Sequence, residues 1–104
     1  IDGLALWASY PAGGDDLSGR SELAATSIYG TADGVAAVEE VLGGQPLLPA
    51  ATVWAPIEGG NHAQFGWYGP QSDADVATIS REEQQAQVIT ATLALLQQVE
   101  SLSR

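Results

Sequence analysis

The sequence predicts an α/β fold in which about three parallel strands carry a short helix and a long C-terminal helix. Three short apolar runs, at 4–9, 24–29 and 52–57, lack the alternation of apolar and polar residues that marks a half-solvated strand. Segments with helical spacing, at 35–42 and 81–102, follow the second and third runs. This order is typical of a parallel sheet covered by helices. With 104 residues, 45% of them hydrophobic, the chain has the size and composition of one globular domain.

The first strand is expected at 4–9, where an unbroken apolar run ends at a Tyr-Pro pair. We expect this strand to be buried on both faces of the sheet. The second strand, at 24–29, contains two β-branched residues and ends in the turn 30–34. The third strand, at 52–57, contains Pro56, which must lie at the strand end or lack a ladder partner. Three aromatic residues within these strands are expected in the core: Trp7, Tyr29 and Trp54.

The short helix is expected at 35–42, where valines and a leucine recur at helical spacing and Gly43-Gly44 gives a stop signal. The long helix is expected to begin after Ser80, because Ser80 and Glu83 form a capping-box pattern. Its apolar residues form a predicted stripe, with Gln and Glu on the other face. The stripe consists of Val88, Ile89, Leu93, Leu95, Leu96, Val99 and Leu102.

The candidate chemistry lies where two of the predicted strands end. His62, the one histidine of the chain, lies in a glycine-rich loop just past the third strand, and Asp33 follows the second strand. The carboxyl ends of parallel strands share one edge of a sheet, which is where ligands bind in open α/β folds. A carboxylate beside an imidazole fixes its tautomer and stabilises its charged form. We therefore identify Asp33 and His62 as a candidate acid–base pair.

Each candidate also has a purely structural interpretation. An Asp followed by Gly after a strand is commonly a turn residue, and a single loop histidine need not be functional. Three aromatic residues that follow His62 either line a substrate pocket or cover the edge of the sheet: Phe65, Trp67 and Tyr68. The sequence leaves both alternatives open for them.

Composition and motifs exclude several classes of function. A formal net charge of −10 repels nucleic acid, and the longest apolar run, at 47–57, is too short to span a membrane. With no cysteine and one histidine, neither a disulfide nor a zinc site is expected, and no phosphate-cradling loop is present. The loop aspartates lack the regular spacing of a calcium site and are interpreted as solvated: Asp15, Asp16, Asp73 and Asp75. We expect no cofactor and no metal.

Three segments carry a resemblance to a known family. They are Leu6–Ala12 (LWASYPA), Ser27–Gly34 (SIYGTADG) and Ile57–Gly66 (IEGGNHAQFG), of which the third is the most specific. Together they resemble the C-terminal portion of bacterial α/β-hydrolases of the dienelactone-hydrolase-like kind, alpha/beta hydrolase family 5. The resemblance implies that the three strands are the last three of an α/β-hydrolase sheet. It also implies that Asp33 and His62 are the acid and histidine of a Ser-Asp-His triad that hydrolyses esters.

The chain departs from that pattern in lacking the G-x-S-x-G nucleophile elbow. We therefore expect residues 1–104 to be a single partial domain, whose natural start lies upstream because the chain begins Ile-Asp-Gly without Met. The expected partners are an N-terminal segment or partner chain that supplies the serine, and a small ester-like substrate. The alternative is a non-catalytic acidic interaction module that associates through its exposed sheet edge.

Overall fold

The structure is a computed structural model that describes residues 2–66, 69 and 74–102. Its strands lie parallel in one sheet in the order β1-β2-β3, which confirms the predicted fold class. In chain order the elements are β1 (Gly3–Trp7), β2 (Ala24–Gly30), α1 (Val38–Leu42), the 3-10 turn η1 (Gln45–Leu47), β3 (Val53–Ile57), the 3-10 turn η2 (Ala63–Phe65) and α2 (Arg81–Leu102). The predicted strands therefore form at the expected places, with no bound shifted by more than two residues.

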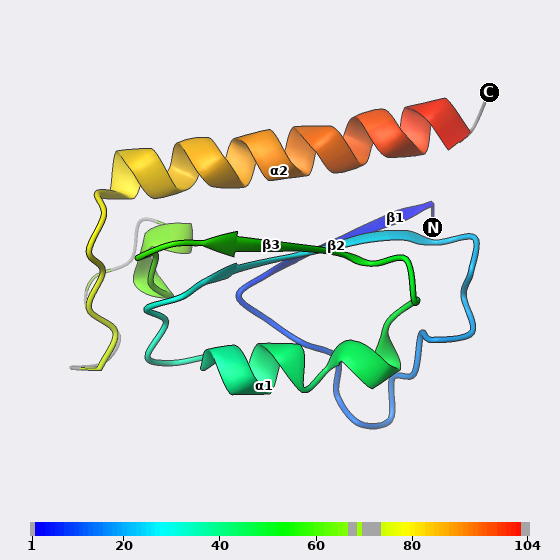
Figure 1. The fold of residues 1–104 in the computed structure, drawn as a ribbon, viewed down its shortest axis with the longest axis horizontal. Helices are drawn as coiled ribbons and strands as arrows, with labels where there is room; N and C mark the ends of the chain where they lie inside the picture. The colour runs from blue at the N-terminus through cyan, green and yellow to red at the C-terminus, as the bar shows by residue number, and fades with distance from the viewer. Residues whose placement is uncertain (1, 67–68, 70–73, 103–104) are drawn as a thin grey trace.

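Helices cover both faces of the sheet (Figure 1), with α2 along one face and α1 against the other. The central strand β2 is buried throughout, and successive residues of a strand point to opposite faces. Ile28 accordingly faces α2, whereas Tyr29 faces α1. The buried cluster on the α2 face consists of Ile28, Ile57 and Val88. The buried cluster on the α1 face consists of Tyr29, Ala36 and Val41.

Strand β1 is less buried than the sequence predicts. Trp7, expected in the core, is 47% exposed, and Ala5 is also exposed. The reason is that β1 lies at the edge of the three-stranded sheet, so only β2 flanks it. The Trp7 indole N–H nevertheless donates to Thr92 Oγ1 of α2 at 3.3 Å. The expectation of burial on both faces holds for β2 and is wrong for β1.

The two edges of the sheet differ in their capacity to accept a further strand. The Ala8 N–H donates to the Ile28 carbonyl, so the even-numbered residues of β1 bond toward β2. The odd-numbered residues, from Gly3 to Trp7, therefore direct their backbone groups to the open side, and β1 contains no proline or charge. On β3 the Thr31 N–H donates to the Ile57 carbonyl, which places Pro56 on the open side. Proline has no N–H to offer there, so β3 is the protected edge.

Helix α2 has the predicted bounds, and the Ser80 hydroxyl accepts the Glu83 N–H at 3.1 Å, as the capping-box pattern requires. Its predicted apolar stripe is only partly buried, because a three-stranded sheet covers a single side of the helix. Val88 and Leu95 are buried, whereas Ile89, Leu93, Leu96 and Leu102 are exposed. Among the described residues, no helix combines the length and apolarity that crossing a bilayer requires.

Helix α1 is shorter than predicted, because it begins at Val38 rather than at Val35. The Asp33 Oδ1 atom accepts the N–H groups of Val35 and Ala36, at 2.8 and 2.7 Å. These bonds hold the segment in a turn that precedes the helix. The same carboxylate that shortens α1 belongs to the candidate site.

Candidate functional site

The loops that follow β2 and β3 lie together at the carboxyl edge of the sheet. The Ala32 N–H donates to the Gly60 carbonyl at 2.9 Å and thereby joins the two loops. A Cβ atom on Gly30, the last residue of β2, would lie 2.3 Å from the Gly60 oxygen, so this approach requires glycine. As a result, Asp33 Oδ2 lies 3.0 Å from His62 Nδ1.

Asp33 uses its two carboxylate oxygens for different tasks. Oδ1 accepts the two backbone N–H groups of the turn before α1, and Oδ2 faces His62. The side chain is fully shielded from solvent, with 0% exposure. The interpretation of Asp33 as a turn residue and its placement beside the imidazole therefore both hold for this one side chain.

His62 presents one ring nitrogen, Nδ1, to Asp33. An ionised carboxylate can only accept a hydrogen bond, so Nδ1 carries the proton that is donated to Asp33 Oδ2. Nε2 has no hydrogen-bond partner among residues 2–66, 69 and 74–102. The His62 side chain is 27% exposed, so the ring is partly open to solvent. This arrangement allows Nε2 to take up and release a proton.

A second carboxylate, Asp75, lies behind this pair. Its Oδ1 accepts the N–H groups of Gly34 and His62, at 3.0 and 2.7 Å, and its Oδ2 accepts the N–H of Ala63 at 3.0 Å. Burial raises the pKa of Asp75, but these three hydrogen bonds and the charge of His62 outweigh it, so the pKa lies below its ordinary value. The interpretation of Asp75 as a solvated loop residue is therefore wrong.

Helix α2 holds the histidine loop through Gln84, which is 0% exposed. The Gln84 side-chain amide pairs with the backbone of Asn61, because Oε1 accepts its N–H at 3.0 Å and Nε2 donates to its carbonyl at 2.8 Å. Gln84 Oε1 also accepts the side-chain amide of Gln64 at 2.9 Å. Asn61 and Gln64, which lie on either side of His62 in the chain, are thus bonded to the helix.

The aromatic residues predicted near the site are only partly described. Phe65 is half-buried and packs against the α2-side cluster of Ile28, Ile57 and Val88. Trp67 and Tyr68 lie outside the described residues. Within the described ranges, no three His, Cys, Asp or Glu side chains are grouped so that they could hold a metal ion.

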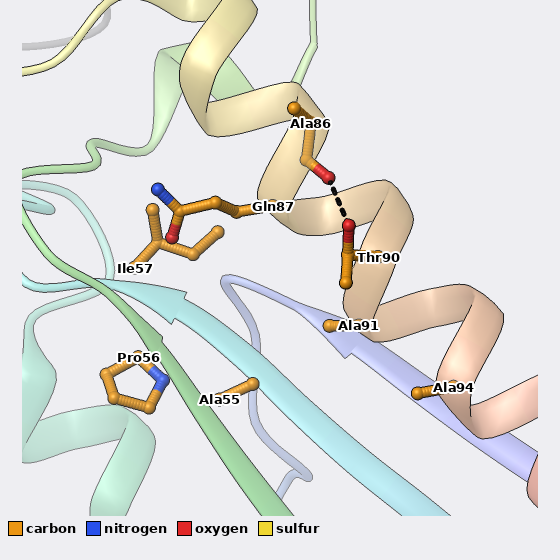
Figure 2. A pocket seen from close by; sticks show the side chains of 8 residues that line it. All are labelled: Ala55, Pro56, Ile57, Ala86, Gln87, Thr90, Ala91 and Ala94. Atoms are coloured by element: carbon orange, nitrogen blue, oxygen red, sulfur yellow. Dashed lines mark hydrogen bonds between the residues drawn. The ribbon is translucent and has the colours of Figure 1, made fainter.

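A groove of about 380 Å³ lies between β3 and α2 (Figure 2). Small and apolar side chains line most of it, and Gln87 and Thr90 supply its polar atoms. The Thr90 hydroxyl is already bonded to the Ala86 carbonyl at 3.0 Å. The lining residues are Ala55, Pro56, Ile57, Ala86, Gln87, Thr90, Ala91 and Ala94, which include neither Asp33 nor His62.

Comparison with known proteins gives one finding. A model of the alpha/beta hydrolase family matches residues 1–86, a range that includes Asp33, His62, Asp75 and Gln84. The match supports the alpha/beta hydrolase family as a whole, and it does not extend to the expected likeness to bacterial dienelactone-hydrolase-like members. No curated protein and no solved structure matches the chain.

Proposed function

Because the chain belongs to the alpha/beta hydrolase family, we propose that Asp33 and His62 are the acid and histidine of a Ser-Asp-His triad that hydrolyses a small carboxylic ester. The observation that carries the proposal is the 3.0 Å contact from His62 Nδ1 to Asp33 Oδ2, while Nε2 bonds to none of the residues that the structure describes. Phe65, Trp67 and Tyr68, which follow the histidine in the chain, are the residues proposed to contact the substrate.

In the proposed reaction, His62 Nε2 removes the proton from a serine hydroxyl as the serine oxygen attacks the ester carbonyl. The imidazolium then gives this proton to the departing alcohol, which leaves an acyl-serine. Water deacylates the serine by the same route, and His62 again transfers the proton. Asp33 holds the ring and stabilises its charged form throughout. The N–H groups of Val35 and Ala36 bond to Asp33 Oδ1 and thereby keep Oδ2 in place.

The serine is proposed to come from a segment upstream of this chain or from a partner chain, because no G-x-S-x-G elbow occurs in residues 1–104. The open edge of β1 supports this proposal. Its outward backbone groups can pair with another strand, whereas Pro56 blocks such pairing at β3. A strand added beside β1 and parallel to it would end at the same edge of the sheet as Asp33 and His62.

The first test is to treat the native protein with a fluorophosphonate probe and to find by intact mass which polypeptide gains the adduct. We expect one adduct on a serine supplied from outside residues 1–104. The His62→Ala variant should label at least about 100-fold more slowly, because a general base contributes roughly that much or more. The exposed Asp16, which accepts the Ser18 N–H and lies in a different loop from Asp33 and His62, supplies the control Asp16→Asn. Labelling of His62→Ala at the wild-type rate would contradict the assignment.

The alternative function is an interaction module, and the exposed apolar residues of α2 favour it. Ile89, Leu93 and Leu96 are each more than half exposed, at 57%, 52% and 58%. Together with the open β1 edge, they give the chain two surfaces on which a second copy could pack. An elution volume that falls as protein concentration rises, in material that no serine probe labels, would favour this alternative over the hydrolase.

A further inference from the structure

We propose that Asp75 is a positioning residue that holds the acid loop and the histidine loop in register. The inference rests on the proposed function, since it concerns the same Asp33–His62 pair. Asp75 contacts the backbone beside both residues, and one of its oxygens bonds to the two loops at once.

The bonds form a closed ring. Asp75 Oδ1 accepts the N–H of Gly34, the residue that follows Asp33, at 3.0 Å. The same oxygen accepts the N–H of His62 at 2.7 Å, and the His62 ring returns to Asp33 Oδ2 at 3.0 Å. Each link is a hydrogen bond of normal length, so the separation of the acid from the imidazole is set by the Asp75 carboxylate as well as by the two strands.

Two further contacts keep Asp75 in place. Asn61 Nδ2 donates to the Asp75 carbonyl at 2.9 Å, in a buried position. A Cβ atom on Gly34 would lie 2.2 Å from the carbonyl carbon and oxygen of Ala74, so the segment that carries Asp75 is seated directly on the acid loop. The acid loop can accept this neighbour because residue 34 is glycine.

The buried, fully bonded state of this carboxylate agrees with a positioning role. Asp75 is 7% exposed, and each of its oxygens accepts at least one N–H. Its pKa is lowered by these bonds, so it is ionised at neutral pH, when it is a hydrogen-bond acceptor only. Both oxygens are used for these backbone bonds, so its effect on a substrate must pass through the Asp33–His62 pair.

The test reads the ring of His62 directly. His62 is the one histidine of the chain, so long-range ¹H–¹⁵N spectra of the ¹⁵N-labelled full chain give its Nδ1 and Nε2 signals without ambiguity. The contact with Asp33 favours the neutral form protonated on Nδ1. In Asp75→Asn we expect the ratio of the Nδ1–H to the Nε2–H form to fall by about tenfold, since a bond to a charged group contributes about that much.

Asp16→Asn is the matched control, because it alters an exposed aspartate that also accepts a backbone N–H. It should leave the ratio unchanged. Gly34→Ala is the second variant, because it displaces the Asp75 segment while every carboxylate and the imidazole remain, and it should lower the ratio in the same direction. It decides the matter if Asp75→Asn does not fold. Wild-type ratios in folded Asp75→Asn or in folded Gly34→Ala would overturn the positioning role.

This outcome is separate from that of the serine probe. A lowered ratio, together with no fluorophosphonate adduct on any polypeptide of the native protein, would support the positioning of His62 by Asp75 and reject the triad. An adduct that depends on His62, with an unchanged ratio in Asp75→Asn, would reject the positioning role and support the triad.

Discussion

Replacement of Gln84 by leucine should destabilise the fold by about 3 kcal/mol, because two buried backbone groups lose their partners. Gln84 is 0% exposed, and its side chain satisfies the N–H and the carbonyl of Asn61, which is itself buried. Leucine has nearly the volume of glutamine, so little cavity forms and the loss is mainly that of hydrogen bonding. Each unpaired group costs about 1–3 kcal/mol, and the added apolar burial offsets part of the sum.

The assay is urea unfolding followed by circular dichroism at 222 nm, with free energies from linear extrapolation. Gln98→Leu, on the exposed side of the same helix, is the matched control and should change the free energy of unfolding by less than about 0.5 kcal/mol. Equal free energies for Gln84→Leu and Gln98→Leu would refute the role assigned to the Gln84 amide.

The Gln84→Glu variant adds a pH dependence with a definite sign. The glutamate keeps one oxygen for the Asn61 N–H. Its other oxygen replaces the Gln84 Nε2 atom, which in the wild type lies 2.8 Å from the Asn61 carbonyl oxygen. A proton is needed there, so the pKa of the new carboxyl should rise above its ordinary value of about 4.3. The free energy of unfolding of Gln84→Glu should be nearest to that of the wild type below about pH 4. It should fall as the pH rises through the raised pKa of the new carboxyl. A loss of stability relative to wild type that is the same at pH 4 and pH 7 would contradict this reasoning.

Three further predictions concern stability and association. The wild type should be more stable than Asp75→Asn at pH 7, and this difference should shrink in urea titrations as the pH falls below 3.8, the ordinary value, because the pKa of Asp75 is depressed in the fold. Gly30→Ala should lower the midpoint of thermal unfolding, because its Cβ would lie 2.3 Å from the Gly60 oxygen, whereas Gly13→Ala, with nothing within 4 Å, should not. Leu93→Gln, at 52% exposure, should leave the free energy of unfolding within about 0.5 kcal/mol of wild type, whereas Leu95→Gln, at 4%, should lower it by at least about 2 kcal/mol. If Leu93→Gln also abolishes any concentration dependence of the elution volume, α2 is the interface of the alternative function.

The fold could be predicted because its signals are local. Apolar runs without a period of two gave the three strands, and the Ser80–Glu83 pattern gave the start of α2. Exposure could not be predicted as well, because it depends on which strand lies at the edge of the sheet. Trp7 and Leu93 have the side chains of core residues, yet the first lies on an edge strand and the second on the outer side of α2.

The candidate site likewise has residues that the sequence predicted and residues that it did not. Asp33 and His62 follow strands that end at one edge, so topology alone placed them together. Asp75 and Gln84 gave no such signal, because an aspartate in a long loop and a glutamine near the start of a helix are commonly solvated. Asp75 accepts backbone N–H groups 12, 13 and 41 positions away, and Gln84 pairs with the backbone of a residue 23 positions away. No spacing rule relates these residues.

The placement of Pro56 limits the size of any assembly that forms through strand pairing. A copy with two usable edges could add neighbours at both and grow into a fibre. Here β3 is blocked by proline on its open side, so each copy offers only β1. Two copies that join through β1 leave no edge for a third, and the interface is then the same patch on both. Association of this kind ends at a closed dimer.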